Sequence, residues 1–382
     1  MAEGLSGGDL SRLRRLNART VVETLKGGPP LTLTQISVRT GLSRASTDDV
    51  VRELLEQGWV TEEEPTAGQV GRPARRFRFH AEAGWVLGVD ICAHRTLAVV
   101  ADLDGGVRHA AMTAVDPDAD RTARLAAVDE AVETCVAGAG VRGADIWASG
   151  VATVGLVDRD GRVASEALPD WKGVDLAAHV GRHIASRPVL VESDSKLAAL
   201  AEHWQGAGRY ADDMVYLFVG SRVGAGLVVN GRLHRGYGNA AGEVGTLPAC
   251  GTNLSAAGPS WPGRRGSGAG DWLDLLGAAR KGDRAALSAV GVYAQQLACG
   301  AAALILTLDP HLVVLGGPYS ADADLLLTPF RQELERWCIR TPEVRLSPLG
   351  DDAVALGAVR FALDNIEEHR MDTPARPTMP SA

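Results

Sequence analysis

The sequence lacks three features: paired cysteines, an apolar leader and any long run of apolar residues. Its five cysteines stand singly, without the spacings of a disulfide framework or a zinc site, which fits free thiols in a reducing compartment. The first residues are polar, unlike a secretory signal, and no run reaches the roughly 18 apolar residues that a membrane helix needs. We therefore expect a cytoplasmic chain without a membrane partner.

Length and charge indicate a chain of more than one domain. Its 382 residues exceed one ordinary core, and contents of 46% hydrophobic and 23% charged residues are typical of a globular protein. The net charge of −8 is unevenly spread, because residues 1–80 hold 12 Lys and Arg against 10 Asp and Glu. Four of these basic residues fall within residues 72–78, and such local clustering matters more than net charge for contact with phosphates.

The first eighty residues carry the pattern of a helix-turn-helix. Ala18, Val21, Val22 and Leu25 have the spacing of an amphipathic helix, which the following glycines and prolines stop. A second, short helix begins with a capping-box pattern at Thr32 and Gln35. Gly41 then suits a tight turn that needs a positive φ.

A third helix is predicted over residues 43–57, with Ser43 as its N-cap, and is the candidate recognition helix. Recognition helices contact base edges near their N-terminus, so we expect Arg44, Ser46 and Thr47 to bind DNA. Thr47 also belongs to the predicted inward-facing stripe of this helix. Asp48 could accept from a cytosine amine, but its favourable place at the positive end of the helix dipole is the preferred interpretation.

Two short strands, at Trp59-Val60 and at residues 77–79, flank a basic loop that we interpret as a wing. Its Gly71-Arg72-Pro73 segment is extended, because proline fixes its own φ and biases the preceding residue away from helix. Such a segment can lay an arginine along a narrow minor groove. The alternative is a solvated basic linker between domains. The predicted DNA contacts of the wing are Arg72, Arg75 and Arg76.

The remaining three hundred residues contain two hairpins of matching design. In the first, a buried-strand pattern at residues 85–91 leads through a polar tip to a second apolar strand. In the other, residues 214–219 lead through a glycine-rich tip at residues 220–226 to a strand at residues 227–229. Helical segments follow both hairpins, so we predict two α/β halves that face a cleft. Glycine-rich tips at such a cleft can bring backbone amides to phosphate oxygens.

Seven segments, taken in order and spacing, resemble the ROK family (repressors, open reading frames and sugar kinases) of the actin/hexokinase-like superfamily. They are Thr40-Gly41-Leu42-Ser43, Gly71-Arg72-Pro73, Leu87-Gly88-Val89-Asp90-Ile91, Leu168-Pro169-Asp170-Trp171, Asp194 with Ala198-Ala199-Leu200-Ala201-Glu202, Ala241-Gly242-Glu243-Val244-Gly245, and Leu315-Gly316-Gly317. The resemblance implies an α/β fold in which a winged helix-turn-helix precedes a two-lobed, actin/hexokinase-like domain. We expect a DNA-binding domain over residues 1–82, a sugar-kinase-like sensor over residues 83–365 and a disordered tail over residues 366–382.

Both phosphate-binding tips depart from the pattern of ROK kinases. Those kinases have Asp-x-Gly-Gly-Thr at the first tip, whereas this chain has Asp90-Ile91-Cys92-Ala93-His94, whose β-carbons hinder close approach to a phosphate. At the second tip Arg222 adds a large cation where the family has no side chain. Two altered tips predict a protein that is not an enzyme. The alternative is an active sugar kinase with a DNA-binding head.

The resemblance assigns two retained carboxylates to a sugar site. Asp194 matches the base of the kinases and is expected here to be vestigial rather than catalytic. Glu243 matches a sugar-binding glutamate, while Ser193 and Thr246 replace an asparagine and a histidine. We expect these four residues to contact an effector, and Arg222 to favour an anionic one such as a sugar phosphate. The alternative is that the carboxylates make only structural hydrogen bonds.

No metal site and no cofactor are expected. ROK relatives bind zinc through a histidine and a cysteine-rich loop, but here the histidine is Thr246 and residues 247–268 contain only Cys250. His179 and His183 stand at i, i+4 and could ligate a metal. Because no third ligand is nearby in the sequence, we interpret them as an exposed helix face.

The expected function is that of a DNA-binding transcriptional regulator, a repressor by resemblance, without phosphotransfer. Its expected partners are a double-stranded DNA operator, a sugar or sugar phosphate, and further copies of the chain. A homodimer or homotetramer is expected because two half-sites need a two-fold partner. The helices predicted around residues 283–308 and 325–336 are the candidate contact surfaces. A further alternative is a ligand-independent regulator that receives its signal from a protein partner.

Overall fold

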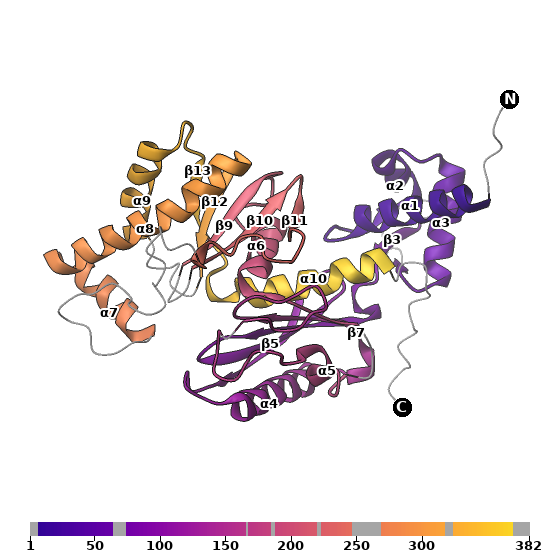
Figure 1. Ribbon diagram of the computed structural model, residues 1–382. Helices are drawn as coiled ribbons and strands as arrows, with labels where there is room; N and C mark the ends of the chain where they lie inside the picture. The colour runs from indigo at the N-terminus through magenta and orange to yellow at the C-terminus, as the bar shows by residue number, and fades with distance from the viewer. Residues whose placement is uncertain are drawn as a thin grey trace.

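In the computed structural model of the chain, a small N-terminal head lies at one end of a two-lobed body (Figure 1). The structure describes residues 7–63, 74–165, 167–184, 188–219, 223–246, 269–317 and 324–369, except for the side chains of residues 7–11, 246 and 269–273. A helix near the C-terminus, α10 (Ala353–His369), runs along the body and ends beside the head (Figure 1).

The head consists of three helices and a small antiparallel sheet of order β1-β3-β2. Its elements are α1 (Gly7–Leu25), β1 (Leu31–Thr32), α2 (Leu33–Thr40), α3 (Arg44–Glu56), β2 (Val60–Glu63) and β3 (Arg76–Phe79). The helix ends lie where the sequence predicts them. Thr32 and Gln35 complete the capping box of α2, Gly41 takes a φ of 71°, and Ser43 caps α3.

Strands β2 and β3 pair as the two predicted strands of the wing. Strand β1 extends their sheet on the other side of β3 and was not anticipated from the sequence. The loop between β2 and β3, which holds Arg72, lies outside the described residues.

Each lobe of the body contains a five-stranded sheet. The first lobe comprises β4 (Trp85–Ile91), β5 (Arg95–Asp102), β6 (Val107–Ala114), α4 (Arg121–Ala139), β7 (Ile146–Thr153), α5 (Leu176–Val180) and β8 (Val189–Ser193). The second comprises β9 (Met214–Phe218), β10 (Gly224–Val229), β11 (Arg232–His234), α7 (Ala269–Arg280), α8 (Arg284–Leu308), β12 (Leu312–Gly316), α9 (Asp324–Trp337) and β13 (Glu343–Leu346). Helix α6 (Asp194–Gln205) packs against both α10 and β10.

The two sheets have the same topology, which confirms the predicted duplication. Their strand orders are β6-β5-β4-β7-β8 and β11-β10-β9-β12-β13. In each, three consecutive antiparallel strands come first, and two parallel strands are added beside the first of them. Short 3-10 turns connect several elements: η1 (Ala81–Ala83), η2 (Gly143–Asp145), η3 (Val244–Thr246) and η7 (Gly350–Asp352).

Helix α10 packs unusually close to its neighbours because glycines face it. A β-carbon at Gly150 of β7 would lie 2.0 Å from the carbonyl oxygen of Ala358, and one at Gly88 of β4 would lie 2.7 Å from that of Ala355. On the opposite side, a β-carbon at Gly357 would lie 1.8 Å from the carbonyl oxygen of Leu197 in α6. Because the backbone of α10 packs directly against the backbones of β7 and α6, the helix has little room to shift relative to them.

The head and the first lobe share one hydrophobic core. It joins Trp59 and Phe79 of the head to Trp147 of β7 and to Val359 and Leu363 of α10. The rings of Trp59 and Trp147 meet edge to face with centroids 5.4 Å apart. The head is therefore packed onto the body rather than tethered to it, and the predicted boundary at residues 82 and 83 falls inside the turn η1.

The expected extent of the C-terminal tail needs correction. The predicted disordered tail begins too early, because α10 continues to His369 and buries Ile366, while residues 370–382 lie outside the described part.

Helix α8 is long and apolar enough to cross a membrane by length and composition. However, Tyr293, Leu297 and Ile305 of α8 are buried in the core of the second lobe.

Candidate functional site

The N-terminus of α3 presents a short polar surface. The Arg44 side chain is exposed, and Ser46 is partly exposed with its Oγ 2.9 Å from that of Ser43. Asp48 forms an ion pair of 2.6 Å with Arg52 one turn later, so this carboxylate is held along the helix. Arg44 and Ser46 therefore remain accessible at the end of α3 where recognition helices contact base edges.

The expected DNA contact by Thr47 is wrong. Its side chain is fully buried under α3, and its Oγ1 donates a 2.9 Å hydrogen bond to the carbonyl oxygen of Ser43. The apolar stripe of the helix, to which Thr47 belongs by spacing, decides its orientation. Thr47 supports the core of the head instead of facing a ligand.

The arginines beside the wing differ in how they are held. Arg75 forms a two-pronged ion pair with Glu62 of the neighbouring strand and lies over the ring of Phe77. Their hydrogen bond lowers the pKa of Glu62 and raises that of Arg75. Arg76 is exposed on β3 and makes no side-chain hydrogen bond to any residue that the structure describes. Of the two, Arg76 is the one presented to a partner.

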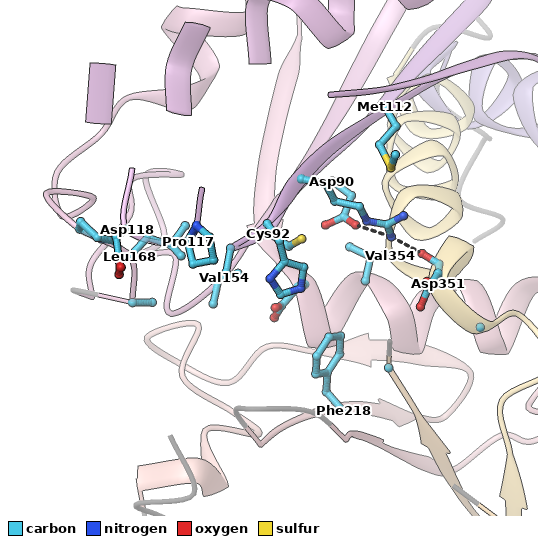
Figure 2. A pocket seen from close by; sticks show the side chains of 18 of the residues that line it. Asp90, Cys92, Met112, Pro117, Asp118, Val154, Leu168, Phe218, Asp351 and Val354 are labelled. Carbon is cyan, nitrogen blue, oxygen red and sulfur yellow. Dashed lines mark hydrogen bonds and ion pairs between the residues drawn. The ribbon is translucent and has the colours of Figure 1, made fainter. Parts of the chain in front are cut away.

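A cavity of about 590 Å³ lies between the two lobes (Figure 2). The first lobe contributes the β4–β5 tip with Asp90, Cys92 and His94, and the second contributes Phe218. Its wall is largely apolar, and Asp194 at the start of α6 lines it as well. Such a cavity, with few convergent polar groups, is the usual form of a small-molecule site.

The β4–β5 tip is fixed by two arginines. Arg124 of α4 is fully buried and donates 2.9 Å hydrogen bonds to the carbonyl oxygens of Cys92 and Ala93. Arg95 lies 3.6 Å from the Asp90 carboxylate and donates to the carbonyl oxygen of Asp351, which precedes α10 (Figure 2). The amide of Cys92 is used within the tip, where it bonds to the carbonyl of Arg95. This amide is therefore not free for a phosphate.

Two buried carboxyl groups give the cavity its electrostatic character. Burial, together with the nearby carboxylates of Asp90 and Glu243, raises the pKa of Asp194 to about 7. Burial also raises the pKa of Asp90 to about 6, against the opposing effect of Arg95. Near neutral pH these groups can therefore both donate and accept hydrogen bonds, which suits a hydroxyl-rich ligand.

A buried lysine connects the predicted effector residues. Lys196 Nζ donates to Ser193 Oγ at 3.1 Å and lies 3.7 Å from Glu243 and 3.9 Å from Glu192. Burial raises the pKa of Glu243, with Lys196 acting in the opposite direction. Glu192 is in turn held by Arg235 at 2.8 Å. The network joins the end of β8 to the segment after β11.

The structure thus brings together three predicted effector residues: Ser193, Asp194 and Glu243. Arg222 lies outside the described residues, and so does the side chain of Thr246. Lys196 was not anticipated from the sequence. Its partner Glu192 belongs to strand β8, so the pairing rule for charges four residues apart on a helix does not apply to them. Arg95 and Arg124 were not anticipated either, because no local pattern marks them.

The sequence predicts that His179 and His183 lie on an exposed helix face, but in the structure they do not. Both side chains are mostly buried, and each Nε2 lies 2.6 Å from Oδ1 of Asp129 on α4. Fifty residues of sequence separate the partners, so spacing alone could not bring them together.

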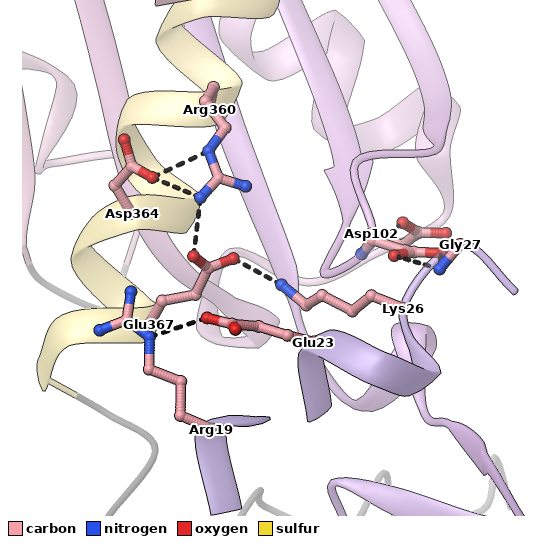
Figure 3. A network of polar contacts seen from close by, with 9 residues as sticks. Arg19, Glu23, Lys26, Gly27, Asp102, Arg360, Asp364 and Glu367 are labelled. Atoms are coloured by element: carbon pink, nitrogen blue, oxygen red, sulfur yellow. Dashed lines mark hydrogen bonds and ion pairs between the residues drawn. The ribbon is translucent and has the colours of Figure 1, made fainter. Parts of the chain in front are cut away.

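A polar network connects α10 to the head (Figure 3). Glu367 of α10 accepts hydrogen bonds from Lys26, just after α1, at 2.5 Å and from Arg360 at 2.7 Å. The backbone amide of Gly27 is held by the Asp104 carboxylate of the β5–β6 turn at 2.9 Å. These contacts fix the end of α1 to the body.

Comparisons with known proteins also distinguish the head from the two-lobed body. The ROK family profile matches residues 86–259 and 269–365, and the IclR helix-turn-helix profile matches residues 17–64. A xylose repressor of Caldicellulosiruptor bescii is 23% identical over 94% of this chain and 98% of its own length. A glucokinase of Streptomyces coelicolor is 26% identical over 98% of its own length but 73% of this chain. The crystal structure of a ROK family transcriptional regulator, a homologue of the E. coli MLC protein, is also similar to this chain. The match covers 92% of this chain and 96% of that one, with a TM-score of 0.72 and a sequence identity of 20%.

Proposed function

The chain belongs to the ROK family, and from this premise we propose that it is a DNA-binding transcriptional repressor with a small-molecule sensor. One observation carries the proposal. The similarity to a xylose repressor includes the head, whereas a glucokinase matched over almost its whole length leaves more than a quarter of this chain unmatched. The helix-turn-helix is thus part of what this chain shares with repressors.

In this proposal the DNA contacts are made by α3 and the wing. Arg44 and Ser46 face the major groove, because the N-terminus of a recognition helix reaches base edges. Arg76 meets the phosphate backbone, and Arg72 of the wing lies along the minor groove. Arg75 contributes less, because Glu62 already neutralises it.

The effector in this proposal is a sugar or a sugar phosphate. Asp194, Glu243, Ser193 and Thr246 contact its hydroxyl groups, and Arg222 would meet a phosphate. Support comes from the raised pKa of Asp194 and from Lys196, which holds Ser193 and Glu243 at one place.

Helix α10 is the proposed link between effector and DNA. Its N-terminal end meets the cavity at Val354 and is tied to the β4–β5 tip through Arg95 and Asp351. Its C-terminal end is tied to the head through Glu367 and Lys26. The 17 residues of α10 span about 25 Å. Because glycines lock α10 against β7 and α6, a change at the cavity is expected to move the helix and the head together.

We also propose that the working form is a homodimer or homotetramer in the cytoplasm. Two-fold symmetry would present two copies of α3 to two half-sites on DNA. Exposed apolar side chains on α8, at Leu287, Val292 and Leu306, are compatible with contact between copies.

Phosphotransfer is the second candidate function, and it rests on Asp194. This carboxyl group matches the kinase base and has a pKa of about 7, which suits proton abstraction. Against it stands the β4–β5 tip, where Cys92 uses its amide internally and Arg124 holds the loop down. Incubation with ATP and a panel of hexoses separates the two candidates, because catalytic turnover of any sugar would establish a kinase.

The proposed function is tested by DNA selection followed by effector screening. Full-length protein is used to select bound fragments from genomic DNA, and their affinity is measured by fluorescence anisotropy with pentoses, hexoses and their phosphates. We expect a two-fold symmetric site and at least one sugar that weakens its binding. Retention of the site with no response to any sugar would favour the regulator signalled by a protein partner, and absence of any selected site would contradict the proposal.

A further inference from the structure

Helices α4 and α5 bring three potential metal ligands together on the outer side of the first lobe. Asp129 comes from the middle of α4, while His179 and His183 come from α5 and the turn that follows it. Their ligand atoms all lie within 4.8 Å of one another. We propose that Asp129, His179 and His183 bind one divalent transition-metal ion, of which Zn²⁺ is the best match to two imidazoles and a carboxylate.

The geometry is close to that of a loaded site. Each histidine directs Nε2 at the same carboxylate oxygen, at 2.6 Å. Ligand bonds of about 2.0–2.1 Å to zinc place tetrahedral ligand atoms about 3.3 Å apart. Placing an ion between the three groups requires the Asp129 oxygen to withdraw by about 0.7 Å from each histidine nitrogen, which a small side-chain rotation provides, and the ligand atoms, now within 4.8 Å of one another, to close around the ion.

Burial favours the pair of histidines as ligands rather than as a surface feature. Their side chains are only 11% and 17% exposed, and the Asp129 side chain is 33% exposed. The histidine positions are held by the fold, because the carbonyl oxygen of His183 packs against Gly143, where a β-carbon would lie 2.7 Å from it. The backbone of His183 is thus fixed, and the site is open to solvent at the carboxylate, which leaves the fourth position for water.

A second carboxylate supports the same interpretation. Glu133, one turn after Asp129 on α4, lies 3.4 Å from Nδ1 of His183, on the other side of the ring from Nε2. A carboxylate behind a histidine orients the ring and strengthens it as a ligand, as in carboxylate–histidine–zinc sites. Glu133 is therefore assigned a positioning role.

Arg182 is the group that competes with the ion. Its guanidinium donates to Nδ1 of His179 at 2.6 Å, which places the ring proton on Nε2, where a metal would bind. Binding requires this proton on Nδ1 and the arginine turned away. Arg182 lies on the exposed side of the turn and can do so. Because Arg182 must be displaced before the ion binds, its removal in Arg182→Ala is expected to increase metal affinity, whereas unchanged affinity would show that it does not compete.

The site would stabilise the floor of the effector cavity. Helix α4 carries both Asp129 and, five residues earlier, Arg124, which holds the β4–β5 tip. An ion that joins α4 to α5 therefore restrains the helix that supports Cys92 and Ala93.

The test is metal titration of full-length protein stripped with EDTA. Zn²⁺ stoichiometry and affinity are measured by calorimetry, and the Co²⁺ absorption spectrum reports the ligand type, since a site without cysteine lacks the thiolate charge-transfer band. The variants are His183→Gln, Glu133→Gln and Arg182→Ala, with exposed His234→Gln on β11 as the matched control.

We expect one ion in the wild type, loss of this ion in His183→Gln, and a weakening of about 10- to 100-fold in Glu133→Gln. His234→Gln should match the wild type. Equal stoichiometry and affinity in the wild type and His183→Gln would overturn the proposal. If His183→Gln fails to fold, Glu133→Gln decides, because its side chain is 68% exposed and unchanged affinity in that folded variant would overturn the proposal equally.

Discussion

The head and the inter-lobe cavity are built on opposite principles. In the head, side chains follow local rules: caps satisfy helix ends, the apolar stripe of α3 faces inward, and Arg75 pairs across the sheet with Glu62. In the cavity, the ionisable groups of Asp90 and Asp194 are taken out of water, and Lys196 is buried near them, a cost that a fold accepts where a ligand must be recognised. The head thus shows the local pairings of a stable fold, whereas the cavity keeps ionisable groups out of water at a cost in stability.

The shared core makes the largest prediction. Trp59→Ala removes the edge-to-face contact with Trp147 and leaves a cavity where the head meets β7, which is expected to cost about 3–5 kcal/mol of unfolding free energy. Urea denaturation followed by circular dichroism measures it, with Trp337→Ala, a half-exposed tryptophan at the end of α9, as the control. Because the core is continuous, both head and first lobe should be destabilised. If the head alone unfolded in a separate transition at lower urea concentration, the head and the first lobe would not share one cooperative core.

The cavity makes the next largest prediction, through Asp194. Its pKa is about 7 in the folded chain and 3.8 in the unfolded one, so the folded state keeps a proton that the unfolded state releases. Stability therefore falls as pH rises from about 4 to about 7, and the penalty is complete above pH 7. Asp194→Asn removes this penalty and should be more stable than the wild type by on the order of 4 kcal/mol at pH 8.

Thermal and urea unfolding between pH 5 and pH 8 measure this difference, which should shrink as the pH is lowered. Exposed Asp160→Asn is the control and should follow the wild type at every pH. If the difference in stability between Asp194→Asn and the wild type did not change with pH, burial of the Asp194 carboxylate would carry no cost in stability. The contrast between the cavity and the head would then be lost.

Much of the head could be predicted from sequence, because its determinants are local. Thr32, Gln35, Gly41 and Ser43 act within a few residues of themselves, and the structure confirms each. Thr47 has two predicted roles, one in the apolar stripe and one as a DNA contact near the N-terminus of α3, and the stripe decides its buried position. Strand β1 has two residues, too few to give an alternating pattern.

The cavity could be predicted only in part, because its determinants are distant in sequence. The resemblance identified Asp194 and Glu243, but the contacts of Arg95 with Asp351 join residues 256 apart. Similarly, Asp129 meets His179 across 50 residues. No spacing rule reaches over such separations, so these contacts depend on the fold.

On the DNA side, Arg44 is expected to have a moderate effect. Arg44→Ala should weaken operator binding by about 1–3 kcal/mol and relax sequence preference at one position, because the side chain is exposed at the start of α3. Fluorescence anisotropy on the selected site measures it. Arg52→Ala on the same helix is the matched control, since Asp48 and Asp49 already pair with it. An equal loss for both variants would mean that α3 contributes only charge.

The smallest effect is expected at Thr47. Thr47→Val keeps the buried shape and removes a hydroxyl that bonds only to the carbonyl of Ser43. DNA affinity should stay within about twofold of the wild type, and stability within about 1 kcal/mol. The anisotropy assay used for Arg44 measures the first quantity and urea unfolding the second. A loss of DNA affinity as large as that of Arg44→Ala would restore Thr47 as a contact residue.

The central claim is that this ROK chain reads DNA through α3, under control of its cavity. Genome-wide mapping of bound sites in cells that carry either the wild type or Arg44→Ala tests it most directly, with and without a sugar that the cavity binds. The account predicts a small set of two-fold symmetric sites that the sugar empties and that Arg44→Ala loses. Sites that neither the sugar nor the substitution affects, or no enriched sites at all, would contradict it.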